Sequence, residues 1–338
     1  MSAPQQFPPA CHSAGHAPLR RPGSIRRTTS IDSEWPEGAG KAWQLTGRAR
    51  DLLTPFTGNP VVLEEASFRI LASPVREILE IASAPEHPGV PALVGVRGAG
   101  ASRSRIEEQL GDLKGHPLYQ LLDDYAGASL VATWIWSRWA PDWAERSLSS
   151  PLRSTAGRGG NMLNVCAGFA PGSSSIFPDG SPNTEIQLST EVGRLENPDD
   201  PLGWHDMPVQ SGPQKRRARR TDLWREGGLI HIDAGFQDSG STPDGGRRAV
   251  HEYRVYAEID EATGRLITIQ ALPLVLPYLE CPGASVQVAR LVGQPVSTFR
   301  STVLEALPST LGCTHLNDVL RSLADVPHLV KQLPAEPD

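Results

Sequence analysis

The hydrophobic pattern of the chain is clearest near its C-terminus. From His251 onward, apolar residues occupy every second position at Tyr253, Val255, Ala257 and Ile259, which is typical of a strand buried on one face. Residues 260–264 predict a turn and residues 266–272 a second strand, so the segment is expected to form an antiparallel hairpin. His251 is in phase with the apolar positions, and its side chain is expected on their face.

Three helices are predicted after this hairpin, over residues 284–292, 295–307 and 314–325. The last carries leucine and valine at helical core spacing, and Thr314 is the expected N-cap because its hydroxyl can accept a bond from a first-turn amide. Cys313 would then lie at the positive end of the helix dipole, which favours thiolate over thiol. His315 would lie beside it in the first turn.

The upstream patterns are mixed. Alternation over residues 43–51 predicts a strand that places Asp51 on the same face as Trp43 and Leu45. Residues 61–84 fit both a strand and a helical stripe, and that segment stays open. Short helices are expected over residues 104–113 and 117–124. The tryptophan-rich residues 129–139 predict a buried strand, with an aromatic wall for an apolar ligand as the alternative.

The middle of the chain predicts little regular structure. Residues 152–222 are rich in Gly, Pro, Ser and Asn and are expected to be mostly loops, with a possible strand over residues 162–169. The basic run at residues 215–220 is interpreted as a solvated loop or strand edge, and anion capture is the alternative. The whole pattern predicts an α+β fold with a mixed or mainly antiparallel sheet and a C-terminal helical layer. We expect one domain over residues 25–330, a flexible arm at 1–24 and a flexible tail at 331–338.

Composition narrows the possible partners. The chain has 338 residues, 39% apolar residues and a net charge of −6, a balance that disfavours binding to a phosphate backbone, so nucleic acid is not an expected partner. We find no signal-peptide core in the first thirty residues and no apolar run of about 18 residues, so no membrane partner is expected. Four scattered cysteines, Cys11, Cys166, Cys281 and Cys313, favour reduced thiols and a cytoplasmic location.

Several short motifs match a known family. They are residues 25–28 (IRRT), residues 47–51, His251 with Glu252 and Tyr253, Cys281, and the closing residues 312–316 (GCTHL). In their order and local context the chain resembles the bacterial family called domain of unknown function 2889. The resemblance implies a common core of residues 25–52 and 251–330, with residues 53–250 as an elaboration found in longer members. Glu252 departs from the aspartate usual in the family, and the resemblance implies no particular activity.

The cysteines and histidines permit three interpretations. In the first, Cys313 is a nucleophile, His315 or His251 is its general base, and Asp51 or Glu252 orients the imidazole. In the second, Zn²⁺ is bound tetrahedrally by two sulfurs and two nitrogens, from His251, Cys281, Cys313 and His315. In the third, these residues only pack and hydrogen-bond, since cysteine is among the most often buried residue types.

Packing alone is the simplest interpretation of these residues. Among functional hypotheses the first is favoured, and it predicts an enzyme of small-molecule metabolism acting on an organic or acyl substrate. The alternative is a non-catalytic protein that binds a ligand or partner, or a metal-binding protein. A small-molecule ligand or substrate is the expected partner. The sequence motifs require no cofactor. Zinc is the one cofactor that the cysteine and histidine residues would permit. It specifies neither the substrate nor the oligomeric state.

Overall fold

A computed structural model describes residues 4–98, 100–128, 130–140, 142, 162–209 and 211–336. These residues form a nine-stranded sheet in which every pairing is antiparallel, in the order β4-β3-β2-β1-β6-β7-β8-β5, with β9 also paired to β8. The strands are β1 (Ser24–Glu34), β2 (Trp43–Thr54), β3 (Val61–Ala72), β4 (Ile78–Ala84), β5 (Thr190–Glu191), β6 (Gln214–Glu226), β7 (Leu229–Ser241), β8 (Arg247–Asp260) and β9 (Leu266–Val275).

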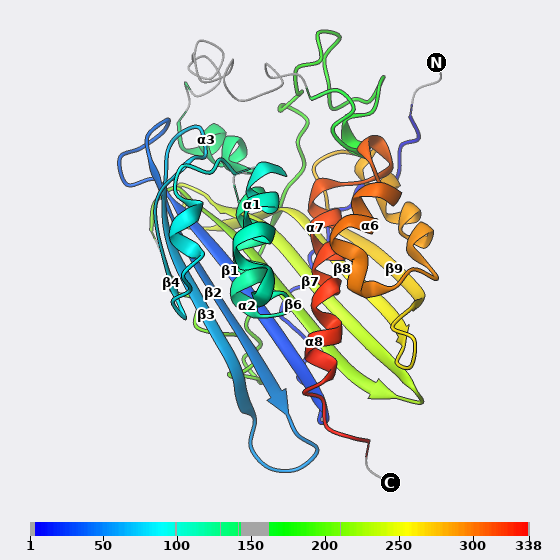
Figure 1. The fold of residues 1–338 in the computed structure, drawn as a ribbon. Coiled ribbons are helices and arrows are strands. Elements are labelled where there is room, and N and C mark those ends of the chain that lie inside the picture. Colours follow the sequence, from blue (N-terminus) through cyan, green and yellow to red (C-terminus); the bar gives the residue numbers. More distant parts are fainter. Residues whose placement is uncertain are drawn as a thin grey trace.

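The helices lie over one face of this sheet (Figure 1). They are α1 (Gly100–Leu110), α2 (Pro117–Asp124), α3 (Ala132–Trp139), α6 (Phe299–Ala306), α7 (Thr314–Ser322) and α8 (Val326–Val330). Shorter 3-10 segments are Val90–Leu93, Gly111–Leu113, Tyr125–Gly127, Ala167–Phe169, Cys281–Leu291, Val296–Thr298, Ser309–Leu311 and Leu323–Asp325. The α+β class, the antiparallel sheet and the C-terminal helical layer are thus confirmed.

Several predicted elements are present. The hairpin of β8 and β9 and the strand β2 follow the alternating apolar positions that predict them, and α2 spans the predicted residues. The segment left open between strand and helix is the β3–β4 hairpin. Residues 284–292 form a 3-10 segment rather than an α-helix, and each of the next two predicted helices joins an α-helix to a 3-10 turn.

The tryptophan-rich segment was predicted wrongly as a strand, because residues 132–139 form the helix α3. Helical geometry places Trp134 and Ile135 against β7 at Gly240, where an added Cβ would lie 2.6 Å from Ile135 and 2.9 Å from Trp134. The missing side chain of that glycine lets α3 pack closely on the sheet. Tertiary packing therefore overrides the strand preference of these aromatic residues. The predicted strand at 162–169 is likewise absent; this stretch forms turns and a 3-10 segment.

The basic run is also not a solvated loop or edge. It belongs to β6, in the middle of the sheet between β1 and β7, and Lys215 and Arg217 are each 1% exposed. Aspartates on neighbouring elements neutralise the run. Arg217, for example, binds Asp238 on β7 and Asp318 on α7, each at 2.9 Å. Charged residues replace apolar ones on this strand, so hydrophobic alternation could not reveal it.

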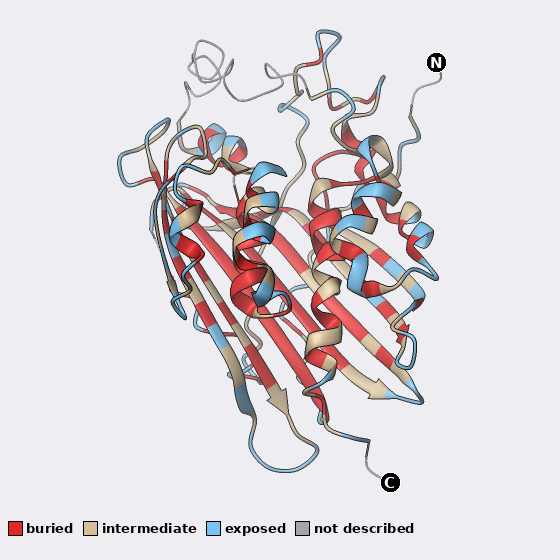
Figure 2. Ribbon diagram, viewed as in Figure 1, coloured by how far each residue is buried: buried red, intermediate tan, exposed pale blue. Residues whose placement is uncertain are grey.

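Two apolar cores lie between the helices and the sheet (Figure 2). One joins β6–β9 to the C-terminal helices, and the other joins β1–β4 to α1, α2 and α3. Buried ion pairs lie along the boundary of the two cores; they include Arg27–Asp51, Arg217–Asp318 and Arg321–Asp123. The cores are thus joined through a buried polar seam.

Both predicted flexible ends make contacts with the body. In the expected arm, the His12 amide donates to Leu274 O at 2.9 Å, and Arg20 pairs with Asp200 at 2.7 Å. In the expected tail, Leu333 is buried in the C-terminal core. The structure therefore places most of the arm and part of the tail along the domain. Across the described residues, no helix has both the length and the apolar character needed to cross a bilayer.

Candidate functional site

The register of strands β6, β7 and β8 places three charged or titratable residues side by side. Arg217 on β6 lies opposite Asp238 on β7, and Asp238 lies opposite His251 on β8. Cross-strand partners point to the same face of a sheet, with Cβ atoms about 4.5–5.5 Å apart. This row lies on the helical face, where α7 approaches the sheet.

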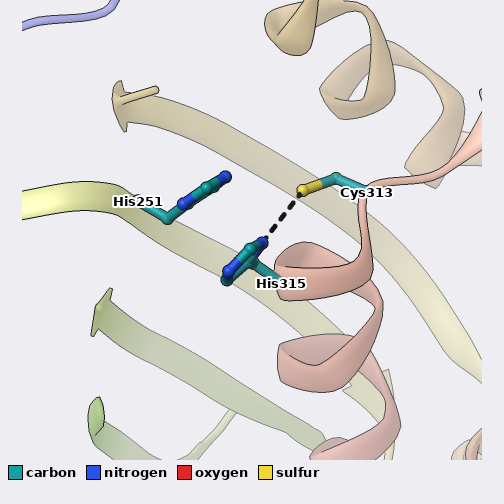
Figure 3. Close-up of side chains that lie close together, drawn as sticks. All are labelled: His251, Cys313 and His315. Carbon is teal, nitrogen blue, oxygen red and sulfur yellow. Dashed lines mark hydrogen bonds between the residues drawn. The ribbon is translucent and has the colours of Figure 1, made fainter. Parts of the chain in front are cut away.

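The start of α7 supplies the remaining reactive groups. Cys313 is the N-cap, with an extended backbone, and Thr314 is the first helical residue; the prediction that Thr314 is the N-cap was wrong by one residue. The Cys313 sulfur lies 3.9 Å from His315 Nδ1, and His315 Nε2 lies 3.3 Å from a carboxylate oxygen of Asp238. Figure 3 shows Cys313, His315 and His251 facing one another from α7 and β8.

The electrostatics favour charge separation between the sulfur and the imidazole. Burial opposes ionisation of the Cys313 thiol, but the interaction with His315 outweighs it and lowers the pKa of the thiol. Burial likewise opposes protonation of His315, but Asp238 and Cys313 outweigh it and raise the pKa of that imidazole. Both shifts stabilise a thiolate next to an imidazolium, and the position at the helix N-terminus adds to the effect.

Asp238 is the acid that lies beside the His315 imidazole, and sequence reasoning missed it. Its side chain is fully buried, and it also binds Arg217 through both oxygens and lies 3.4 Å from Lys215 Nζ. Despite the burial, these cations hold the pKa of Asp238 well below its usual range. The sequence does contain an indication of this acid. Along β7, Asp238 continues the alternation of Ile232, Ala234 and Phe236, so its side chain lies on the same face of the strand.

His251 stacks on His315, with ring centroids 3.5 Å apart and planes 13° apart. Its Nδ1 is shielded from solvent and has no hydrogen-bond partner among the described residues. Burial and the neighbouring His315 lower the pKa of His251 well below its usual value, so this imidazole is neutral beside a charged one. A neutral ring can accept a proton or hold a water molecule.

The two acids predicted from the sequence lie elsewhere. Asp51 is paired with Arg27, with the shorter contact at 2.6 Å. The register separates Asp51 from His251 by four strand spacings and four residues along the strands, or about 20 Å. Glu252 faces the opposite side of the sheet from His251, because adjacent strand residues alternate, and accepts bonds there from the Ala14 amide and Gln237. The structure therefore brings neither acid to His315.

Two more cysteines border the same site. Burial raises the pKa of Cys166 to about 12, and burial with its neighbours raises that of Cys281 well above the usual value. The Cys281 sulfur packs on Gly168, where an added Cβ would lie only 2.5 Å from it. These thiols stay protonated, so the structure distinguishes Cys313 from both.

A cavity of about 780 Å³ adjoins this cluster. Of the six residues singled out in the sequence, it is bordered by four: His251, Cys281, Cys313 and His315. Its other walls are mainly apolar and come largely from residues 130–137 and 162–187, among them Trp134, Val165, Phe169 and Phe177, with Tyr278 from the segment after β9. A volume of this size is typical of small-molecule sites.

The ligand atoms of His251, Cys313 and His315 lie within 4.8 Å of one another, so they form a possible metal site. Zn²⁺ binds imidazole nitrogen at about 2.0–2.1 Å, near the plane of the ring. Two nearly parallel rings with centroids 3.5 Å apart cannot both meet that condition unless one of them rotates. The arrangement therefore fits a stacked acid–base pair better than a shared ion.

Tyr253 is a further neighbour of the sulfur, and its hydroxyl contributes to the lowered pKa of Cys313. We expect Tyr253→Phe to raise the pKa of this thiol, because the variant loses a polar hydroxyl near the thiolate. Alkylation of Cys313 by iodoacetamide at pH 6 should slow by at least about twofold. Tyr256→Phe, at a partly exposed position on the same strand, is the control and should leave the rate unchanged. An unaltered rate in Tyr253→Phe would show that the hydroxyl does not stabilise the thiolate.

Comparison with known proteins adds a family assignment. Residues 215–328 match the model of a family described as protein of unknown function (DUF2889). No curated protein and no solved structure matches the chain. The matched segment includes Arg217, Asp238, His251, Cys313 and His315, whereas most of the apolar cavity wall lies outside it. The similarity to the DUF2889 family is thus shown over residues 215–328.

Proposed function

We propose that this protein is a thiol-dependent hydrolase or acyl-transfer enzyme that acts on a small organic ester or thioester. The observation that carries the proposal is the series of contacts from the Cys313 sulfur to His315 and from His315 to Asp238, at the border of a cavity of about 780 Å³. A nucleophile, a base and an acid that orients the base are the parts that covalent acyl transfer requires.

The chemistry uses only these residues and water. The Cys313 thiolate attacks the acyl carbon, and a C–S bond forms as the bond to the leaving alkoxide or thiolate breaks. The His315 imidazolium gives its proton to the leaving group. Water then attacks the thioester while neutral His315 accepts its proton, which releases the carboxylic acid and restores the thiolate–imidazolium pair.

The backbone supports this chemistry at the start of α7. The first-turn N–H groups of a helix have no intrahelical acceptor, and here they follow directly after Cys313. Such donors can stabilise the negative charge that develops on an acyl oxygen. Asp238 keeps His315 oriented and charged, and the neutral ring of His251 stacks on it from the other side.

Trapping the acyl-enzyme tests the proposal. The protein is mixed with p-nitrophenyl acetate, quenched in acid and analysed by intact mass and peptide mapping. We expect one acetyl group on Cys313 and a burst of nitrophenolate equal to the enzyme concentration. Acetylation spread over several residues, or a burst that persists in Cys313→Ala, would contradict the proposal and favour a non-catalytic ligand-binding protein.

A metal centre is the second candidate, supported by the proximity of the ligand atoms of His251, Cys313 and His315. Elemental analysis of the purified protein separates the two proposals. The hydrolase requires no metal, and its acylation should survive treatment with a chelator. Stoichiometric zinc or iron, lost together in the His251→Ala and Cys313→Ala variants, would favour the metal centre instead.

The same reasoning supports a cytoplasmic location and a small-molecule partner rather than nucleic acid. Cys166, Cys281 and Cys313 border one cavity as free thiols, a state that a reducing compartment maintains. The net charge of −6 disfavours a polyanionic partner. Fractionation of the native host and a salt-dependent nucleic-acid binding assay would test these two expectations.

A further inference from the structure

The chemistry of the cavity walls carries an inference about the substrate, and it rests on the proposed function. We infer that the cavity accepts an uncharged, mainly apolar acyl group of medium length, and that the wall residues within 130–137 and 162–187 determine this selectivity. The reactive groups come from a different part of the chain, on β7, β8 and the start of α7.

The side chains that line the cavity are largely aromatic and aliphatic. Among the described residues, the aromatic side chains of Trp134, Phe169, Phe177 and Tyr278 border the cavity together with several aliphatic or thioether side chains. Such a wall gains free energy when it covers apolar substrate surface and excludes water. A volume of about 780 Å³ greatly exceeds that of an acetyl group, so a short acyl chain would leave most of the wall uncovered.

The charges on the cavity wall support the same inference. Among the described residues that border the cavity there is no lysine or arginine, while Asp179 and Glu185 supply two carboxylates. The buried cations Lys215 and Arg217 are already bound to Asp238, and the His315 imidazolium is paired with the Cys313 sulfur. A carboxylate or phosphate at the far end of the substrate would therefore enter an apolar space in which the described wall residues offer it no counter-ion, which is unfavourable.

Ester turnover by the full-length protein tests this selectivity. The panel consists of p-nitrophenyl acetate, butyrate, hexanoate and octanoate, and of the mono-p-nitrophenyl ester of suberic acid, which adds a terminal carboxylate to an eight-carbon chain. We expect kcat/KM to rise with chain length, by up to about fourfold per buried methylene. The suberate ester should react at least about tenfold more slowly than the octanoate ester.

A matched pair of variants locates the selectivity. Val165→Trp fills part of the cavity and should lower kcat/KM for the octanoate ester by at least about tenfold more than for the acetate ester. Val286→Trp places the same side chain at a position that is 63% exposed and does not border the cavity, and it should alter neither. Equal losses for both esters in Val165→Trp would count against a role in selectivity.

A binding measurement separates failure of the selectivity from failure of the proposed function. The neutral fluorescent probe N-phenyl-1-naphthylamine is bound to Cys313→Ala and displaced with octanamide or with suberate; we expect displacement by octanamide alone. If this selectivity is seen but no ester acylates Cys313, the proposed function fails and the inference about the cavity survives. If Cys313 is acylated but acetate or suberate esters react as fast as octanoate, the inference is overturned and the proposed function survives.

Discussion

Cys313→Ala should lower p-nitrophenyl ester turnover by at least about 10³-fold, to the level of general surface catalysis. The variant removes the atom that forms the acyl bond, and none of its neighbours can replace it, because burial keeps Cys166 and Cys281 in the thiol form. His315→Gln should lose nearly as much, since a nucleophile and its base act as a unit. The steady-state rate of nitrophenolate release measures both losses.

Two controls make this prediction specific. Cys11→Ala changes a cysteine that does not border the cavity and should retain full activity. Circular dichroism and thermal unfolding of Cys313→Ala should resemble those of the unmodified protein, because alanine is smaller and needs no hydrogen bond at this buried position. A folded Cys313→Ala protein that retains a tenth or more of the activity would show that this sulfur is not the nucleophile.

Arg217→Met should lower the free energy of unfolding by about 3–5 kcal/mol. Arg217 is 1% exposed and binds both Asp238 and Asp318, so the variant leaves two buried carboxylates short of a cation. Desolvated charges without partners are among the most destabilising features that a substitution can create. Urea unfolding followed by circular dichroism measures the change.

The matched control for this prediction is Arg105→Met. Arg105 lies on α1, is 40% exposed and pairs with the exposed Glu108, so its loss should change the free energy of unfolding by about 1 kcal/mol or less. Similar effects for the two variants would mean that the polar seam between the cores contributes no more than a surface ion pair.

Local patterns predicted the parts of the site that depend on one strand or one helix. The alternation that ends at Ile259 placed His251 on the inner face of a hairpin, and the helical spacing after Thr314 placed Cys313 at a helix start. The orienting acid was predicted wrongly because it depends on which strands are neighbours. Glu252 could have been excluded from the sequence, since adjacent residues of a strand point to opposite faces.

The central strand and α3 show where hydrophobic patterns fail. In β6 the buried positions are Lys215, Arg217 and Arg219, and they are tolerated because Asp238, Asp318 and Asp124 lie next to them. Those partners come from β7, α7 and α2, so the pairing exists only once the chain is folded. Likewise, α3 can pack on the sheet because of Gly240, about a hundred residues further along the chain.

Competitive alkylation of the four cysteines at pH 6 tests whether Cys313 is a thiolate that opens onto the cavity. Folded protein is treated with limiting iodoacetamide, and each cysteine is quantified by peptide mass spectrometry. The lowered pKa of Cys313 and the raised pKa values of Cys166 and Cys281 predict that Cys313 reacts first, and that His315→Gln removes this preference. If Cys313 instead reacts no faster than Cys166 and Cys281, it is a buried, protonated thiol, and the proposed chemistry is excluded.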